Sequence, residues 1–160
     1  MPLFHWLDQQ YHFTLDPCCT RDTRLCHKYY TKQDDGLKQD WGNACVFMNP
    51  PYRREIGDWV KKAYEESRKG ATVVCLIPAR TDTQWWKNYC LQANDAIFLT
   101  GRVKFLENGV SLKAGAPFPS VIVAFHSSVW RPHAGLNCLW RDYKEIEKLY
   151  ANASRGNLNL

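Results

Sequence analysis

The chain has 160 residues, of which 45% are hydrophobic and 14% aromatic, and its formal net charge is +5. This length suits one ordinary domain, and we expect a single domain over residues 1–160. Such a rich supply of apolar and aromatic side chains excludes a disordered chain. No run of about 18 apolar residues is present, and the beginning MPLFHWLDQQYHF carries neither a basic leader nor a long apolar stretch, so we expect a cytoplasmic protein.

Seven cysteines are an odd number, and three of them lie in segments that read as buried, so the pattern argues against a disulfide framework and favours free thiols. The cluster CCTRDTRLCH offers Cys18, Cys19, Cys26 and His27 as zinc ligands, but it lacks the paired CxxC spacing of structural zinc sites. We therefore expect no metal. Small residues packed beside a strand are the simpler interpretation of this cluster.

The first third of the chain predicts a helix, a strand and a second helix. Residues 2–12 have the apolar spacing of a short amphipathic helix. A strand over 12–16 should end at Asp16, because Pro17 cannot donate to a ladder and favours an extended residue before it. Residues 21–41 show a weak helical pattern followed by a DDG turn that contains Asp35, which predicts a helix and then a loop.

The remaining elements alternate between strands and helices. Strands are expected at 44–48 and 71–79, the second a continuous apolar run typical of a strand buried on both faces. A helix over 55–69 should stop at Gly70, and a helix over 81–94 should begin at Thr81 or Asp82. Further elements follow in this order: strands 95–101, 102–106 and 119–126, a helix over 139–153 and a frayed tail at 154–160.

This order predicts an α/β domain with a mostly parallel central sheet, helices on both faces and an antiparallel hairpin at one edge. Ligands of such sheets bind beyond the carboxyl ends of the strands. Asp16, Asn49 and the segment 78–80 each follow a predicted strand, so we expect them to line the same rim.

The segment Asn49-Pro50-Pro51-Tyr52 ends a predicted strand in an unusual way. The simplest interpretation is a rigid loop. A functional one is that the amide oxygen of Asn49 and a backbone carbonyl near Pro50 accept hydrogen bonds from an aromatic amine, which makes its nitrogen nucleophilic and stabilises the charge that develops during alkylation. The prolines would fix these acceptors in advance, and Tyr52 would offer a flat face for the ring. The segment thus predicts a site that alkylates an exocyclic amine.

Six motifs follow one another in the chain: FTLDPCC, DDGLKQDW, VFMNPPYRREIGDWVKKAYEES, VVCLIPARTDTQWW, GRVKF and APFPSVIVAF. This ordered set resembles the phage-type DNA N6-adenine methyltransferase (Dam) family over about residues 3–126. The resemblance implies a Rossmann-like methyltransferase fold, S-adenosylmethionine as cofactor, double-stranded DNA as partner, a flipped adenine and a bacterial or phage-infected cell. It makes Asn49, Pro50, Pro51 and Tyr52 the catalytic residues.

The resemblance also assigns the binding residues. Asp16, Pro17 and Cys18 stand at the family's first cofactor motif, and Asp35 is expected at the adenine end of the cofactor. The turn DPCCT holds no glycine, which departs from many methyltransferases. The residues expected to meet DNA are Arg53, Arg54, Arg80, Thr81, Arg102 and Lys104, with Phe118 packing against the flipped base.

The sequence leaves three interpretations of the function. Methylation of adenine in DNA comes first, followed by an amine methyltransferase acting on RNA or on protein glutamine, and by a nucleic-acid-binding protein with little activity. The family usually starts further upstream, with a tryptophan and a Thr-Pro pair, so we expect this chain to lack that segment. Sequence preference would come from the loops at 80–87 and 106–119.

Overall fold

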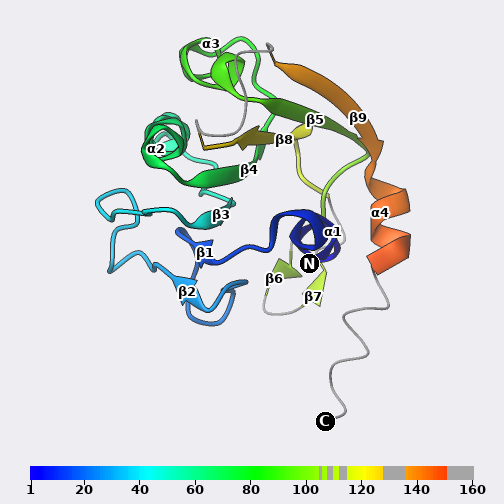
Figure 1. The fold of residues 1–160 in the computed structure, drawn as a ribbon. Helices are drawn as coiled ribbons and strands as arrows, with labels where there is room; N and C mark the ends of the chain where they lie inside the picture. Colours follow the sequence, from blue (N-terminus) through cyan, green and yellow to red (C-terminus); the bar gives the residue numbers. More distant parts are fainter. Residues whose placement is uncertain (105, 108–109, 112–114, 128–135, 151–160) are drawn as a thin grey trace.

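The computed structural model of the chain describes residues 1–104, 106–107, 110–111, 115–127 and 136–150. A seven-stranded sheet forms its centre, in the order β2-β1-β3-β4-β8-β5-β9 (Figure 1). The strands of this sheet are β1 (Leu15–Asp16), β2 (Lys28–Tyr29), β3 (Cys45–Met48), β4 (Thr72–Pro78), β5 (Asp95–Thr100), β8 (Ser120–Phe125) and β9 (Asn137–Asp142). The predicted α/β class is confirmed.

One half of the sheet is parallel. Strand β1 pairs with β2 on one side and with β3 on the other, and β3 pairs with β4 in register Val46↔Val73. The chain therefore runs outward from β1 to β2 and then crosses back to β3 on the far side of β1. At such a reversal, open α/β sheets bind ligands in a crevice beyond the carboxyl ends of the strands, which here are those of β1 and β3.

The antiparallel pairing lies inside the sheet. Strand β8 runs antiparallel to both β4 and β5, whereas β9 pairs parallel to β5 at the outer edge. The prediction of an antiparallel hairpin at the edge of this sheet is therefore wrong. Strands β6 (Leu106–Glu107) and β7 (Val110–Ser111) pair antiparallel in a separate two-stranded sheet. Because β8 is buried at every residue, its apolar pattern gave no sign of its direction.

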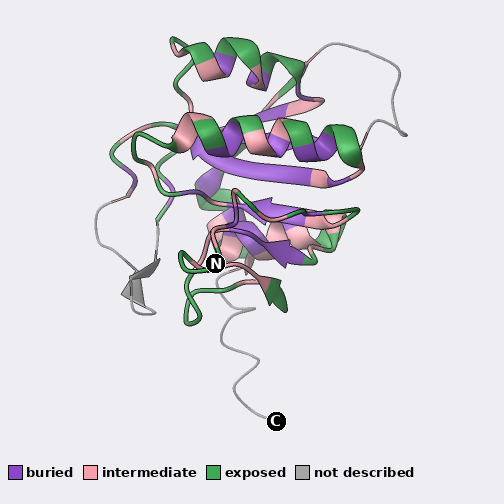
Figure 2. Ribbon diagram, turned by 90° about the vertical axis from the view of Figure 1, so that its left-hand side faces the viewer, coloured by how far each residue is buried: buried purple, intermediate pink, exposed green. Residues whose placement is uncertain are grey.

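Helices cover both faces of the sheet, as predicted. Helix α2 (Ile56–Lys69), helix α3 (Gln84–Asn88) and the short 3-10 helix η1 (Cys90–Gln92) pack on one face. Helix α1 (Pro2–Tyr11) and helix α4 (Tyr143–Tyr150) contact each other on the opposite face. In Figure 2 the central strands are buried, while the helices carry exposed residues on their outer sides.

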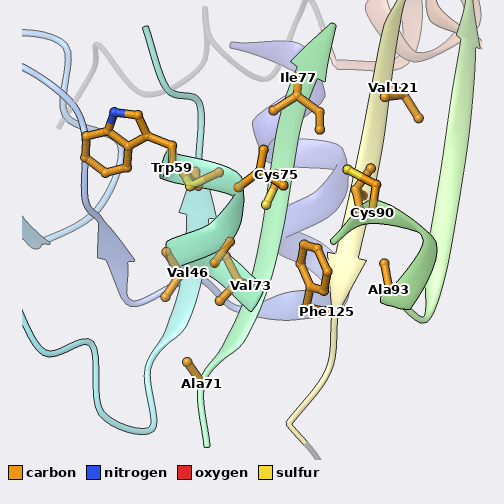
Figure 3. Close-up of a cluster of buried hydrophobic side chains, with 14 of the residues drawn as sticks. Val46, Trp59, Ala71, Val73, Cys75, Ile77, Cys90, Ala93, Val121 and Phe125 are labelled. Atoms are coloured by element: carbon orange, nitrogen blue, oxygen red, sulfur yellow. The ribbon is translucent and has the colours of Figure 1, made fainter. Parts of the chain in front are cut away.

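Apolar side chains fill the layer between α2 and the sheet. Figure 3 shows Val46 from β3, Val73 and Cys75 from β4, and Phe125 from β8 in one cluster, with Cys90 beside them. Each of these five residues is at most 2% exposed. The apolar runs predicted as strands therefore form the core, and their carboxyl ends are held at fixed positions. No helix in the described part of the chain is both long and apolar enough to span a bilayer.

Several local predictions need correction, the first of them at residues 21–27. Residues 21–27 form turns rather than a helix, because Thr20 and Thr23 bond to each other through side chain and backbone and the buried Asp16 carboxylate accepts from the Leu25 amide (3.2 Å). The following Lys28–Tyr29 is a strand, β2, that pairs with β1. The local threonine turn, the Asp16–Leu25 hydrogen bond and the pairing with β1 together outweigh the weak helical pattern.

The later helices begin elsewhere than predicted. Thr83 caps α3 with its hydroxyl, which accepts from the Trp86 amide, so neither Thr81 nor Asp82 is the cap. Residues 139–142 belong to β9, and α4 begins only at Tyr143. Residues 102–104 are not in a strand. Residue 105 of the predicted strand 102–106, residues 108–109 and 112–114 of the loop 106–119, and the predicted tail 154–160 lie outside the described residues.

Candidate active site

The carboxyl ends of β1, β3 and β4 meet at one rim of the sheet. Asp16 is the last residue of β1, Asn49 follows β3, and Pro78 ends β4. Because these strands are parallel and paired in register, the three positions lie side by side. The prediction that they share a rim is confirmed.

The segment after β3 has one defined arrangement. Asn49 is half-buried and Pro50 is buried, and the amide of Arg53 donates to the Pro51 carbonyl (2.9 Å) in a tight turn before α2. The Tyr52 hydroxyl donates to the Asn49 amide oxygen (2.6 Å). It also lies within hydrogen-bond distance of the Leu76 carbonyl oxygen (3.2 Å), to which it can donate instead. Asn49 is thus oriented by its own loop and by the neighbouring strand.

Tyr52 occupies the position that we predicted for a substrate amine. Burial, and secondarily the neighbouring Cys18, raise the pKa of Tyr52, so its hydroxyl stays protonated and remains a hydrogen-bond donor. Its ring meets Phe118 edge to face, with centroids 5.1 Å apart and an interplanar angle of 88°. A base can use the second lone pair of the Asn49 oxygen or compete with the Tyr52 hydroxyl for the first, and a base placed between the two rings must separate them.

The end of β1 holds a buried carboxylate. Asp16 is only 4% exposed, and burial raises the pKa of its carboxyl group, opposed by hydrogen bonds from the Leu25 and Cys18 amides and the Cys19 thiol. The carboxylate therefore organises the turn that follows β1. Burial and the charge of Asp16 also raise the pKa of Cys18 well above its ordinary value, opposed by the backbone amide of Asn49. Cys18 thus lies between the two strand ends as an unreactive thiol.

The loop after β2 folds back onto the end of β1. Gly36 packs so closely on Pro17 that an added Cβ would lie 2.1 Å from the Pro17 carbonyl oxygen. Asp35, just before it, has a left-handed backbone (φ 53°), is half-buried and contacts the Lys38 ammonium (2.9 Å). Both acidic residues assigned to the cofactor therefore lie near the crevice at the reversal of strand order, although each already has a partner within the chain.

Trp41 and Glu66 hold this loop against α2. The Trp41 indole donates to the Gly36 carbonyl (3.1 Å), and the Trp41 amide donates to the fully buried Glu66 carboxylate (2.9 Å). The other oxygen of Glu66 contacts the ammonium groups of Lys62 (2.8 Å) and Lys69 (2.9 Å). The sequence pattern did not single out either residue, because a Glu in a charged helix normally faces solvent.

A cleft of about 330 Å³ opens beside Tyr52. It brings together Arg53, Arg80 and Phe118 of the predicted DNA-binding set. Thr81 is exposed in the adjacent loop, whereas Arg102 and Lys104 do not line the cleft, and the Lys104 ammonium pairs with Glu147 on α4 (3.1 Å). The complete lining is Tyr52, Arg53, Arg54, Ile56, Pro78, Arg80, Thr83, Trp85 and Phe118.

Sequence reasoning missed the contribution of Trp85 to this cleft. Adjacent residues on a helix point in different directions, so the pair Trp85-Trp86 could not have sent both rings into the core. The structure buries Trp86 and leaves Trp85 half-buried in the cleft wall.

Other groups near the rim complete its chemistry. Ser120 begins β8 opposite Pro78, and its buried hydroxyl has no hydrogen-bond partner among the described residues. All seven cysteines are free thiols. In the described part of the chain, no three His, Cys, Asp or Glu side chains gather closely enough to hold a metal ion. Polar oxygens, arginines and aromatic rings are therefore what the rim offers a ligand.

The fold and the rim place this chain among the α/β proteins that hold their ligands beyond the carboxyl ends of parallel strands, where the strand order reverses. Residues 1–148 match the sequence model of one family, and the chain belongs to it: DNA N-6-adenine-methyltransferase (Dam). The family resemblance read from the motifs is confirmed.

Two curated phage proteins are similar in sequence. The DNA N-6-adenine-methyltransferase of Escherichia phage T1 is 32% identical over 88 residues, which cover 54% of this chain and 37% of that protein. The protein of the same name from Haemophilus phage HP1 (strain HP1c1) is 25% identical over 109 residues, covering 66% of this chain and 63% of that protein. The chain thus matches less than two thirds of the length of either relative.

Proposed function

We propose that this chain transfers a methyl group from S-adenosylmethionine to the N6 amine of adenine in DNA, on a Rossmann-like methyltransferase fold and with the adenine flipped out of the duplex. Membership of the Dam family supports the reaction. The observation that carries the proposal is the position of Asn49. Its amide oxygen lies at the carboxyl end of β3, beside the reversal of strand order, and is already held by a hydrogen-bond donor at 2.6 Å.

Asn49 and the backbone at Pro50 activate the amine. Two acceptors on the N–H groups of adenine favour a pyramidal nitrogen whose lone pair can attack, and they stabilise the positive charge on that nitrogen as the new bond forms. The Tyr52 hydroxyl marks where one such donor binds, because it uses the same oxygen of Asn49. Pro50 is buried and Pro51 fixes the turn, so the acceptors need little reorganisation when the base arrives.

The residues around the crevice fit the cofactor. S-adenosylmethionine supplies a methyl group on a positively charged sulfur, which is the electrophile for the amine. Asp16 and Asp35 provide negative charge near that crevice, and Asp35 would face the ribose and adenine end. Pro17 and Cys18 form a turn without bulky side chains, and Cys18 lies next to the backbone of Asn49, so the proposed cofactor and amine sites adjoin each other.

DNA would approach the rim from the side of the arginine-lined cleft. Arg53 and Arg80 are exposed and would contact phosphates, with Arg54 beside them. Phe118 would pack on the flipped adenine after its edge-to-face contact with Tyr52 opens. The unused hydroxyl of Ser120 at the same rim is consistent with a polar ligand there.

A methyl-transfer assay tests the proposal. The purified chain is incubated with S-adenosylmethionine labelled in its methyl group and with unmethylated duplex DNA, RNA or protein, and the products are digested and identified. We expect label in N6-methyl-2′-deoxyadenosine from DNA, and sequencing then maps the methylated positions. Label in RNA or in glutamine instead, or in no substrate at all, would contradict the proposal.

One variant tests the role of Asn49. Asn49→Ala should lower methylation by roughly a hundredfold or more while folding and DNA binding stay near wild type, because the lost acceptor acts mainly in the transition state. Asn43→Ala is the matched control, since Asn43 is exposed at the opposite end of β3. Activity of Asn49→Ala close to that of this control would refute the amine-activation mechanism.

A further inference from the structure

The cleft beside Tyr52 combines positive charge and apolar surface. Three arginines line it, Arg53, Arg54 and Arg80, and its lining includes no acidic residue. All three arginines are exposed. Aromatic rings form part of its wall. This composition is complementary to a ligand that carries both a phosphate and a planar ring.

Trp85 is held in place by its surroundings. A Cβ added to Gly57 would lie 3.3 Å from the Trp85 indole, so the ring packs directly on the first turn of α2. The Thr83 hydroxyl donates to the Arg80 carbonyl (2.8 Å), which orders the loop that leads into α3. The Trp85 ring and the backbone at Arg80 are therefore positioned before any ligand binds, which reduces the entropy lost on binding.

The cleft is distinct from the position of the reacting amine. Asn49 does not line it, whereas Tyr52 lines the cleft and also contacts Asn49. A base at Asn49 and a base against Trp85 would therefore be two different bases, separated by Tyr52. A volume of about 330 Å³ is at the small end of ligand clefts, which span roughly 300–1,000 Å³, so it suits a single nucleotide and not a duplex.

We propose that this cleft binds the nucleotide next to the methylated adenine on the same DNA strand, with its base stacked on Trp85 and its phosphate among Arg53, Arg54 and Arg80. The inference depends on the proposed function, because that function makes DNA the substrate. Tyr52 lines the cleft and also bonds to Asn49, so the two sites adjoin each other, and we expect their occupants to be neighbours along the strand. Stacking on an aromatic ring accepts any base, so this subsite contributes affinity rather than sequence recognition.

Photo-cross-linking tests which base lies on Trp85. Three duplexes are prepared, each with one unmethylated adenine and with 5-iodo-2′-deoxyuridine placed 5′ to it, 3′ to it or opposite it. The full chain is irradiated with each duplex, and mass spectrometry locates the cross-linked residue. We expect Trp85 to cross-link to one of the two same-strand neighbours. A Trp85 cross-link only to the opposite strand, or cross-links from the neighbours only to other residues, would overturn the proposal.

Binding measurements provide an independent readout. Fluorescence anisotropy with the same DNA should show Trp85→Ala binding at least fivefold more weakly than wild type, and Trp85→Phe close to wild type. Trp140→Ala is the control, because Trp140 is an exposed tryptophan on the edge strand β9. Circular dichroism confirms that each variant folds. Equal affinity of Trp85→Ala and Trp140→Ala would overturn the proposal.

The two proposals fail in different ways. Only the subsite is wrong if the wild-type chain methylates adenine, Trp85→Ala binds DNA like wild type, and the neighbouring bases of the wild-type complex do not cross-link to Trp85. If the wild-type chain transfers no methyl group to any DNA, the proposed function is wrong, and a Trp85 cross-link to a neighbouring base would still support the subsite as a nucleotide-binding site.

Discussion

Replacing Glu66 by Gln keeps the shape of a fully buried side chain and removes its charge. Burial alone raises the pKa of Glu66, but hydrogen bonds from Lys62, Lys69 and the Trp41 amide outweigh it and lower the pKa from the ordinary 4.5 to about 2. Lowering the pKa of a carboxyl group on folding stabilises the folded state above the unfolded-state pKa. That contribution should disappear as the pH falls from about 4.5 to about 2.

The expected magnitude follows from this shift. The full difference between 4.5 and about 2 corresponds to about 3 kcal/mol. Lys69 is 62% exposed, and water screens its attraction, which reduces the expected contribution to roughly 1–2 kcal/mol. In the Gln variant the amide nitrogen must face either a lysine ammonium or the Trp41 N–H, which are both donors, and this mismatch adds to the loss.

Urea unfolding followed by tryptophan fluorescence measures the effect. At about pH 7 we expect Glu66→Gln to lower the free energy of unfolding by about 1–3 kcal/mol. The difference from wild type should shrink steadily in acid, because protonation removes the same charge from the wild-type protein.

Glu65→Gln is the matched control on the same helix. Glu65 is 49% exposed and lies 3.8 Å from Lys61, so its loss should change the stability by less than about 0.5 kcal/mol. The explanation is refuted if Glu66→Gln behaves like Glu65→Gln at neutral pH. It is equally refuted if wild type and Glu66→Gln lose stability in parallel on acidification.

Two further predictions concern the rim, and both assays depend on the proposed function. Tyr52→Phe should retain methylation within about tenfold of wild type, because it keeps the ring and removes only the hydroxyl that competes for the amide oxygen of Asn49. Methylation as slow as that of Asn49→Ala would contradict this prediction. Gly36→Ala should lower the melting temperature and weaken the calorimetric binding of S-adenosylmethionine, since its Cβ would collide with the Pro17 carbonyl. A melting temperature and a cofactor affinity equal to those of wild type would argue against a role of the Pro17 contact.

The sequence predicted those parts of the fold whose local pattern agrees with their final environment. The apolar runs of β3 and β4 and the amphipathic pattern of α2 are examples. The prolines at the ends of β3 and β4 indicated where the rim lies. Strand β2 was missed because two residues, Lys28 and Tyr29, carry no strand pattern of their own and depend on pairing with β1. Strand β9 was missed for a related reason, since an exposed edge strand has little apolar signal and α4 follows it directly.

The candidate site was predictable in its residues but not in its contacts. Asp16, Asn49 and Arg80 could be assigned to one rim because the carboxyl ends of parallel strands coincide. The sequence could not show that the Tyr52 hydroxyl takes the acceptor of Asn49, because that hydrogen bond depends on the turn geometry between them. Nor could it place Trp85 in the cleft, because the choice between two adjacent tryptophans depends on how α3 packs on α2.

Helix α2 connects the two halves of the rim. Its first turn follows directly from the Asn49–Tyr52 segment and supports Trp85 through Gly57. Near its other end, Glu66 holds Trp41, and Trp41 holds Gly36 against Pro17 at the end of β1. The amine site and the crevice assigned to the cofactor are therefore both positioned by one rigid element. Under the proposed function, this helix would hold the methyl donor and the amine in line at short distance, as methyl transfer requires.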